Sequence, residues 1–204
     1  MTHDFEKSFI HTNPDPKSEA PLGEETLSEC KDKELRASQE FWQERVERVG
    51  THKSPYLHTP PERIEVFTKR FESLIREHVA NKDVLEIGCG YGRNIKAFSN
   101  CHQYVGIDFI PELIDKAKKN AIPSKVRHVG GAFYPQFSFK CMNLRDLEPG
   151  MHKFDIVVGV SVITSVEYEF PKVLDTLKAV LKPGGYILWL EEEWYRIDWK
   201  DGYG

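Results

Sequence analysis

The stretch "VLEIGCGYG", Val84–Gly92, places an acid, Glu86, inside an apolar run and then three glycines at alternate positions. Glycine accepts backbone angles that other residues avoid, and it lets a ligand approach the main chain without a side chain in the way. A tight turn that binds nothing is the alternative, but three alternating glycines make it the weaker one. The stretch therefore predicts a buried strand, 83–87, followed by a loop that bends around a ligand.

Further apolar segments and helical segments alternate along the chain. Near-continuous apolar strands indicate a sheet covered on both faces. Strands that alternate with helices predict a parallel, doubly wound α/β sheet, because parallel strands need long crossovers. The predicted strands are 83–87, 104–108, 137–143, 154–162 and 185–192, and the predicted helices between them are 93–99, 111–120 and 170–181.

Composition divides the chain into three parts. Residues 1–27 are rich in proline, acid and serine and have few large apolar side chains, so they are predicted to be a disordered tail. Residues 28–61 contain a helix to Val49, with Trp42 and Val46 on one face, and are predicted to form a helical lid. Residues 62–204 hold the strands and are predicted to be the ligand-binding domain.

Bulk properties exclude several classes of protein. The net charge of −4 gives no basic field that would indicate nucleic acid binding. The four cysteines and eight histidines are dispersed without metal-ligand spacing, so no metal is expected. The longest apolar run, 156–163, is too short to span a bilayer, and the first residues lack the apolar segment of a signal peptide. A cytoplasmic location is expected.

The residues around the glycines exclude two common nucleotide sites. A dinucleotide fingerprint, GxGxxG, needs glycine at the position that Arg93 occupies. A phosphate-binding P-loop needs a GK[ST] sequence, which does not follow here. Glu86 would repel a pyrophosphate but suits a ligand that carries positive charge.

The segment Glu86-Ile-Gly88-Cys-Gly90-Tyr-Gly92 resembles motif one, E/D-x-G-x-G-x-G, of the class I S-adenosylmethionine-dependent methyltransferases. Four later segments follow in family order: "YVGIDFIPELIDKAKKN", "CMNLRDL", "FDIVVGVSVI" and "VLKPGGYILWLEE". The resemblance covers about residues 60–193. It implies a Rossmann-like sheet of order 3-2-1-4-5 with 83–87 in the centre. The family's C-terminal hairpin strands are expected to be missing or minimal, because only "EWYRIDWKDGYG" follows.

The resemblance also implies which residues bind S-adenosylmethionine as the cofactor. Asp108 would accept both ribose hydroxyls, and Asn143 would meet the adenine amino group. The alternatives are a strand-end cap for Asp108 and a turn residue for Asn143. Glu86 would orient the ammonium through loop groups or water, while loop amides and a helix N-terminus would receive the carboxylate. The complete implied set is Glu86, Gly88, Cys89, Gly90, Gly92, Asp108, Phe109, Asn143, Leu144 and Val160.

The implied activity is methyl transfer to an unidentified acceptor, most simply a small molecule. Methylation of protein or RNA is an alternative, with a docking patch of Lys116, Lys118, Lys119, Lys125 and Arg127. A second alternative is that the chain is a non-catalytic subunit that binds the cofactor. A protein partner that completes the sheet is a further alternative. No catalytic base is assigned; the candidates after the fourth strand are Ser161, Thr164, Ser165 and Glu167.

Overall fold

The computed structural model describes residues 38–49, 61–121, 136–150, 153–166 and 169–191. The predicted disordered tail, 1–27, lies outside these residues, as do most of the predicted lid and the C-terminal residues from 192 onward. Among the described residues, no helix combines the length and the apolar character that crossing a membrane requires.

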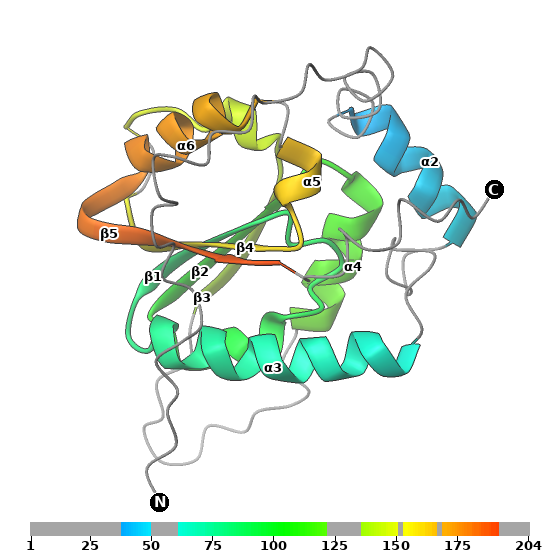
Figure 1. Cartoon of the computed structure of the whole chain (residues 1–204), viewed down its shortest axis with the longest axis horizontal. Helices are drawn as coiled ribbons and strands as arrows, with labels where there is room; N and C mark the ends of the chain where they lie inside the picture. Colours follow the sequence, from blue (N-terminus) through cyan, green and yellow to red (C-terminus); the bar gives the residue numbers. More distant parts are fainter. Residues whose placement is uncertain (1–37, 50–60, 122–135, 151–152, 167–168, 192–204) are drawn as a thin grey trace, which may run out of the picture.

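Five parallel strands form one sheet, in the order β3-β2-β1-β4-β5 (Figure 1). This arrangement confirms the predicted α/β fold, with the strand before the glycine loop in the centre. The strands are β1 Asp83–Ile87, β2 Gln103–Asp108, β3 Gln136–Cys141, β4 Phe154–Val160 and β5 Leu181–Leu190.

Helices cover both faces of the sheet, with α3 along one side and α6 along the other in Figure 1. A short helix, α2, lies beside the end of the sheet near α4 and α5 (Figure 1). The helical elements are α2 Gln39–Val49, α3 Pro61–Val79, η1 Ile95–Phe98, α4 Pro111–Ala121, η2 Leu144–Asp146, α5 Ile163–Val166 and α6 Phe170–Ala179.

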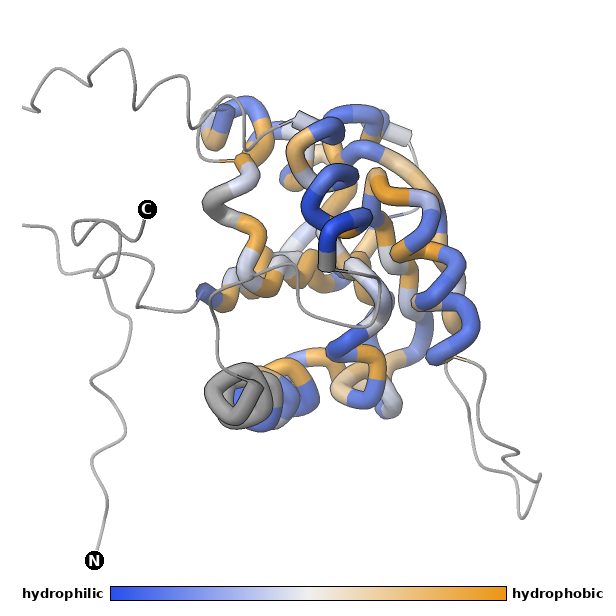
Figure 2. Tube along the Cα trace, turned by 90° about the vertical axis from the view of Figure 1, so that its right-hand side faces the viewer, coloured by the Kyte–Doolittle hydropathy of each residue, from blue (hydrophilic) through white to orange (hydrophobic). Residues whose placement is uncertain are grey.

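The core consists of two layers that the sheet separates. On one face, Phe71 and Ile75 of α3 pack with Phe98 of η1 against the strands. On the other face, Val173 and Leu177 of α6 pack against the strands. Hydrophobic and hydrophilic residues accordingly alternate along the turns of the outer helices (Figure 2). Burial of both sheet faces explains the near-continuous apolar strands of the sequence.

Several element boundaries differ from the prediction by one or more residues, and three of the differences have a clear structural context. The predicted helix 93–99 is only a 3-10 turn, Ile95–Phe98, because α3 already covers that face of the sheet. The fourth strand ends at Val160 and not at residue 162, since Ser161 adopts a positive φ of 55° that a strand does not accommodate. The fifth strand begins at Leu181 and not at 185, with a register shift opposite Phe154–Ile156.

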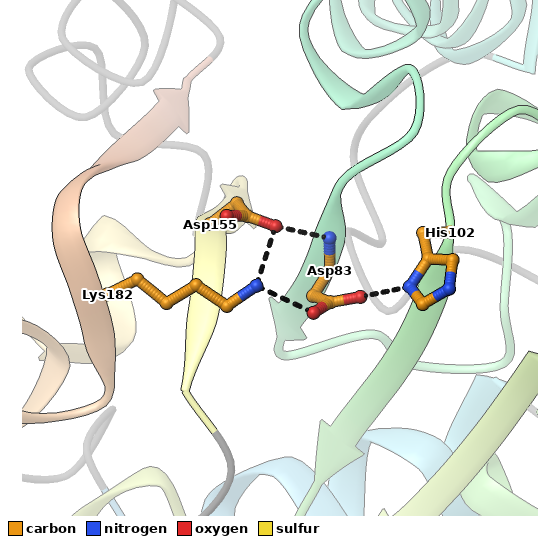
Figure 3. A network of polar contacts seen from close by, with 4 residues as sticks. All are labelled: Asp83, His102, Asp155 and Lys182. Atoms are coloured by element: carbon orange, nitrogen blue, oxygen red, sulfur yellow. Dashed lines mark hydrogen bonds and ion pairs between the residues drawn. The ribbon is translucent and has the colours of Figure 1, made fainter.

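A polar network ties the amino ends of three strands together (Figure 3). Lys182 Nζ lies 2.7 Å from Asp83 Oδ2 and 3.0 Å from Asp155 Oδ2. The backbone N–H of Asp83 donates to Asp155 Oδ2 at 2.8 Å, and His102 Nδ1 lies 2.6 Å from Asp83 Oδ1. The network therefore joins β1, β4 and β5 near the amino ends of the strands, at the opposite end of the sheet from the glycine loop.

Candidate cofactor site

The glycine loop is attached to the carboxyl end of the neighbouring strand. The N–H of Gly90 donates a 3.0 Å hydrogen bond to Asp108 Oδ2, and the N–H of Ile110 donates one of 3.0 Å to Asp108 Oδ1. Burial raises the pKa of Asp108, although these backbone donors counter the shift. Each carboxylate oxygen has a second lone-pair direction, so the carboxylate can hold the loop and still accept a ligand hydroxyl.

A cavity opens at the carboxyl ends of the strands, where ligands of α/β folds bind. It brings together every predicted cofactor residue except Glu86 and Gly92. The predicted residues that line it are Gly88, Cys89, Gly90, Asp108, Phe109, Asn143, Leu144 and Val160. Sequence reasoning did not assign Val46, Arg93, Asn94, Met142 and Arg145 to the site, and they line the cavity as well.

The loop glycines serve different purposes. Gly90 has a φ of 53°, and no atom lies within 4 Å of the place where a Cβ would stand. Gly92 has a φ of 78°, and a Cβ there would lie 3.3 Å from Cα of Ala117 in α4. Gly90 therefore leaves open space beside the cavity, whereas Gly92 permits close packing of the loop on α4. Gly92 does not line the cavity, and its contact with the cofactor stays a prediction.

Glu86 lies beneath the loop and is 1% exposed. Its Oε1 accepts a 3.0 Å hydrogen bond from Nδ2 of Asn94, and its Oε2 accepts one of 2.5 Å from the hydroxyl of Tyr104. Burial raises the pKa of Glu86 from 4.5 to about 7, against the opposing effect of these two donors. Glu86 is therefore a carboxylate enclosed in the protein, and it does not face the cavity.

A glycine without a side chain makes room for the contact between Tyr104 and Glu86. A Cβ on Gly106 of β2 would lie 2.7 Å from the hydroxyl oxygen of Tyr104. Because Gly106 is the β2 partner of Glu86 in the sheet register, the missing side chain leaves the space in which the tyrosine hydroxyl reaches the carboxylate.

The opposite side of the cavity is formed after β3. Asn143 caps η2, with its Oδ1 accepting a 3.1 Å hydrogen bond from the N–H of Arg145. The side chain of Arg145 in turn pairs with Glu169 at 2.6 Å. Asn143 thus caps η2 and also lines the cavity, and its adenine contact stays a prediction.

Helix α2 borders the cavity from outside the sheet. Val46 is buried against Ile110 and Leu113, and Trp42 packs on the same cluster. Nε2 of Gln39 donates a 2.9 Å hydrogen bond to the carbonyl oxygen of Phe109. These contacts join α2 to the segment that follows β2, and they bring Trp42 and Val46 into the cavity lining.

The candidates for a catalytic base have unequal positions. Ser161 and Ser165 line the cavity, and Ser161 is buried. The side chain of Thr164 and all of Glu167 lie outside the described residues. Burial raises the pKa of the Cys89 thiol well above its ordinary value, which fits a packing residue better than a nucleophile.

The family described as "Methyltransferase domain" matches residues 85–189. Among solved structures, the fold is similar to an N-methyltransferase, NodS, from Bradyrhizobium japonicum WM9 in complex with S-adenosyl-L-homocysteine, at 20% identity and a TM-score of 0.57 over 72% of this chain and 71% of that one. It is also similar to magnesium protoporphyrin IX methyltransferase from Synechocystis PCC 6803 with bound SAH, at 16% identity and a TM-score of 0.53 over 74% and 68%. A comparison with curated proteins found no match. The chain therefore belongs to the methyltransferase domain family, as a class I, S-adenosylmethionine-dependent methyltransferase.

Proposed function

We propose that the chain transfers the methyl group of S-adenosylmethionine to a small molecule in the cytoplasm. The observation that carries this proposal is the cavity in which Asp108, the open side of Gly90 and helix α2 meet. The cofactor, when bound, supplies a methyl group on a positively charged sulfur. The chain's own task is then to hold the reacting groups in line and to exclude water.

The residues that line the cavity fit this cofactor. Asp108 offers two oxygens to a vicinal diol, and Gly90 leaves space above the loop. Arg93 lines the cavity and carries the positive charge that a carboxylate needs. We propose that Arg93 binds the carboxylate in place of the predicted helix N-terminus, because η1 is a single 3-10 turn and not a full helix. We propose that Phe109, Asn143 and Leu144 surround the adenine.

The acceptor side favours a small molecule. Trp42 and Val46 of α2 and Val166 of α5 give the cavity apolar walls, and α2 is the described part of the proposed lid. A similar fold occurs in an enzyme whose name states a small-molecule acceptor, magnesium protoporphyrin IX. The free thiols of Cys89, Cys101 and Cys141 are consistent with a cytoplasmic setting.

Protein or RNA methylation is supported less well. In the proposed docking patch, Lys118 of α4 lies 3.5 Å from Asp115 on the same helix, and both side chains are largely exposed. Such a pair is typical of a solvated helix face. Lys125 and Arg127, the other end of the patch, lie outside the described residues.

The test is methyl transfer from S-adenosylmethionine labelled on its methyl group. The protein is incubated with a cell extract that has been separated into small molecules, protein and RNA, and with each fraction alone. The proposal expects label in the small-molecule fraction, and much less label with the Asp108→Ala variant at a cofactor concentration that does not saturate it. Label in the protein or RNA fraction would contradict a small-molecule acceptor. Cofactor binding without transfer to any fraction would favour the non-catalytic subunit.

A further inference from the structure

A carboxylate just beyond the last strand binds the turn that leaves the fourth strand. Glu191 directly follows β5, and its Oε1 accepts a 2.8 Å hydrogen bond from the backbone N–H of Val162 and one of 2.7 Å from Nε1 of Trp189. Val162 is the second residue after β4, which pairs with β5 in the sheet. Hydrogen bonds to an ionised carboxylate are stronger than those between neutral groups, so this contact can fix the turn.

The turn needs such a contact because its backbone is strained. Ser161 has a positive φ of 55°, a conformation that residues other than glycine rarely adopt. Its N–H still donates to the carbonyl oxygen of Leu190 at 2.8 Å, but the next N–H, that of Val162, has a side chain as its acceptor. Glu191 therefore stabilises the turn at the point where the pairing of β4 with β5 ends.

The turn lies between the glycine loop and the wall that α5 contributes to the cavity. A Cβ on Gly88 would stand 2.9 Å from Cγ2 of Val162, so the loop and the turn pack directly together. The segment that begins at this turn, 161–166, carries four residues that line the cavity: Ser161, Val162, Ser165 and Val166. We call this segment the acceptor wall. The turn sets where the acceptor wall stands relative to the glycine loop.

We propose that Glu191 is a positioning residue for methyl transfer, which through the N–H of Val162 holds the acceptor wall at the distance from the glycine loop that the acceptor requires. This rests on the proposed function and names a residue that acts on its acceptor side. Glu191 is not among the described residues that line the cavity, so its effect passes through Val162. A displacement of about 1 Å can slow a reaction about 100-fold, because in-line transfer depends on alignment.

The test compares the rate of methyl transfer with the affinity for the cofactor. The rate is that at which label passes from methyl-labelled S-adenosylmethionine, at a saturating concentration, into the small-molecule fraction of the extract. Calorimetry with S-adenosylhomocysteine measures the affinity. For Glu191→Ala we expect a rate at least about tenfold lower and an affinity within about threefold of wild type, since Asp108 still holds the loop.

Two matched variants separate positioning from charge and from stability. Glu191→Gln should recover most of the rate, because its amide oxygen can accept the same two hydrogen bonds. Lys182→Met changes the other end of β5 and should keep the wild-type rate at a temperature at which every variant is folded. If Glu191→Ala does not fold, Glu191→Asp undergoes the same comparison, with a side chain one methylene too short for the contact.

Four results would overturn the proposal. A wild-type rate in Glu191→Ala would remove the role, and an equal loss of rate in Lys182→Met would show that any weakening of β5 has this effect. A rate in Glu191→Gln as low as that in Glu191→Ala would show that the reaction needs the charge. A loss of cofactor affinity as large as the loss of rate would place the effect at the cofactor.

The wild-type protein distinguishes these failures from a failure of the proposed function. In all four cases wild type still transfers label to the small-molecule fraction, and the proposed function stands. If wild type transfers no label to that fraction, the proposed function fails, and the role of Glu191 fails with it.

Discussion

The N–H of Gly90 donates a 3.0 Å hydrogen bond to Oδ2 of Asp108. The loop after β1 and the acid that ends β2 are thus one unit, although Gly90 and Asp108 lie 18 positions apart in the sequence. The shape of the loop and the position of the acid depend on each other. Substitutions on either side of this bond should therefore affect cofactor binding, but with different signatures.

Replacement of Asp108 by alanine should weaken binding of both S-adenosylhomocysteine and methylthioadenosine by about 10- to 100-fold, because both ligands carry the ribose diol. Asp108→Asn should lose less, since the amide keeps one acceptor. Calorimetry with the two ligands measures the effect. A lower melting temperature with unchanged affinity in the folded fraction would show that Asp108 only holds the loop.

Gly90→Ala and Gly92→Ala form a matched pair. Both place a side chain at a positive φ, which costs about 1–2 kcal/mol. Gly92→Ala also presses on Ala117 of α4 and should lower the melting temperature further, by a few °C. Gly90→Ala projects into the open side of the loop and should reduce affinity for S-adenosylhomocysteine more. Identical melting temperatures and affinities in the two variants would refute the separate roles.

The raised pKa of Glu86 should make the stability of the fold depend on pH. Its pKa rises from 4.5 to about 7 on folding. A raised pKa means that the folded state holds the proton more tightly, so this contribution to stability is complete below pH 4.5 and is lost as the pH rises through about 7. Glu86→Gln has no such loss. The melting temperature of Glu86→Gln minus that of wild type should therefore increase between pH 5 and pH 8, by several °C, for a difference of about 2–3 kcal/mol.

Comparing Glu86→Gln with wild type cancels the effect of all other titrating groups, because both proteins contain them. A difference in melting temperature that is constant across this pH range would show that Glu86 stays ionised in the folded protein, and one that decreases with pH would give it a lowered pKa.

Lys182→Met should destabilise the fold without affecting the cofactor site. Partial burial opposes ionisation of Asp83 and Asp155, but the hydrogen bonds they receive, including those from Lys182, hold the pKa of each below its ordinary value. Loss of the lysine leaves the two carboxylates facing each other. We expect a loss of about 1–2 kcal/mol, or roughly 3–6 °C in melting temperature, with unchanged affinity for S-adenosylhomocysteine.

Lys178→Met is the control, because Lys178 forms an exposed 3.4 Å pair with Asp175 on α6 that should contribute little. Equal melting temperatures for the two variants would mean that the network joining the strands does not stabilise the sheet. A large change in ligand affinity for Lys182→Met would contradict its separation from the site.

The sequence predicted the strands because burial on both faces leaves a continuous apolar run. It placed β1 at residues 83–87, as observed. The predicted helix after the glycine loop is wrong, because helical patterning reports only local sequence. That face of the sheet is covered by Phe71 and Ile75 of α3, which precede the strand in the chain. Strand ends were misplaced where single residues, such as Ser161 at positive φ, stop the pairing.

Part of the candidate site was readable from motifs and part was not. The loop glycines and Asp108 follow from the spacing of residue types along the chain. Asn94 does not, because a polar residue after such a loop is equally typical of a helix cap. Its pairing with Glu86 depends on the fold of the loop, and the Tyr104 contact depends on the register of β1 with β2. Such contacts between strands leave no local pattern.

The most direct test of the account is one titration of the wild-type protein with S-adenosylhomocysteine and, separately, with NAD. The cavity offers Asp108 for a ribose and Arg93 where a dinucleotide site needs a glycine. We predict saturable binding of S-adenosylhomocysteine, one ligand per chain, and no measurable binding of NAD at the same concentrations. Comparable binding of NAD, or no binding of S-adenosylhomocysteine, would contradict the assignment of this cavity to the cofactor.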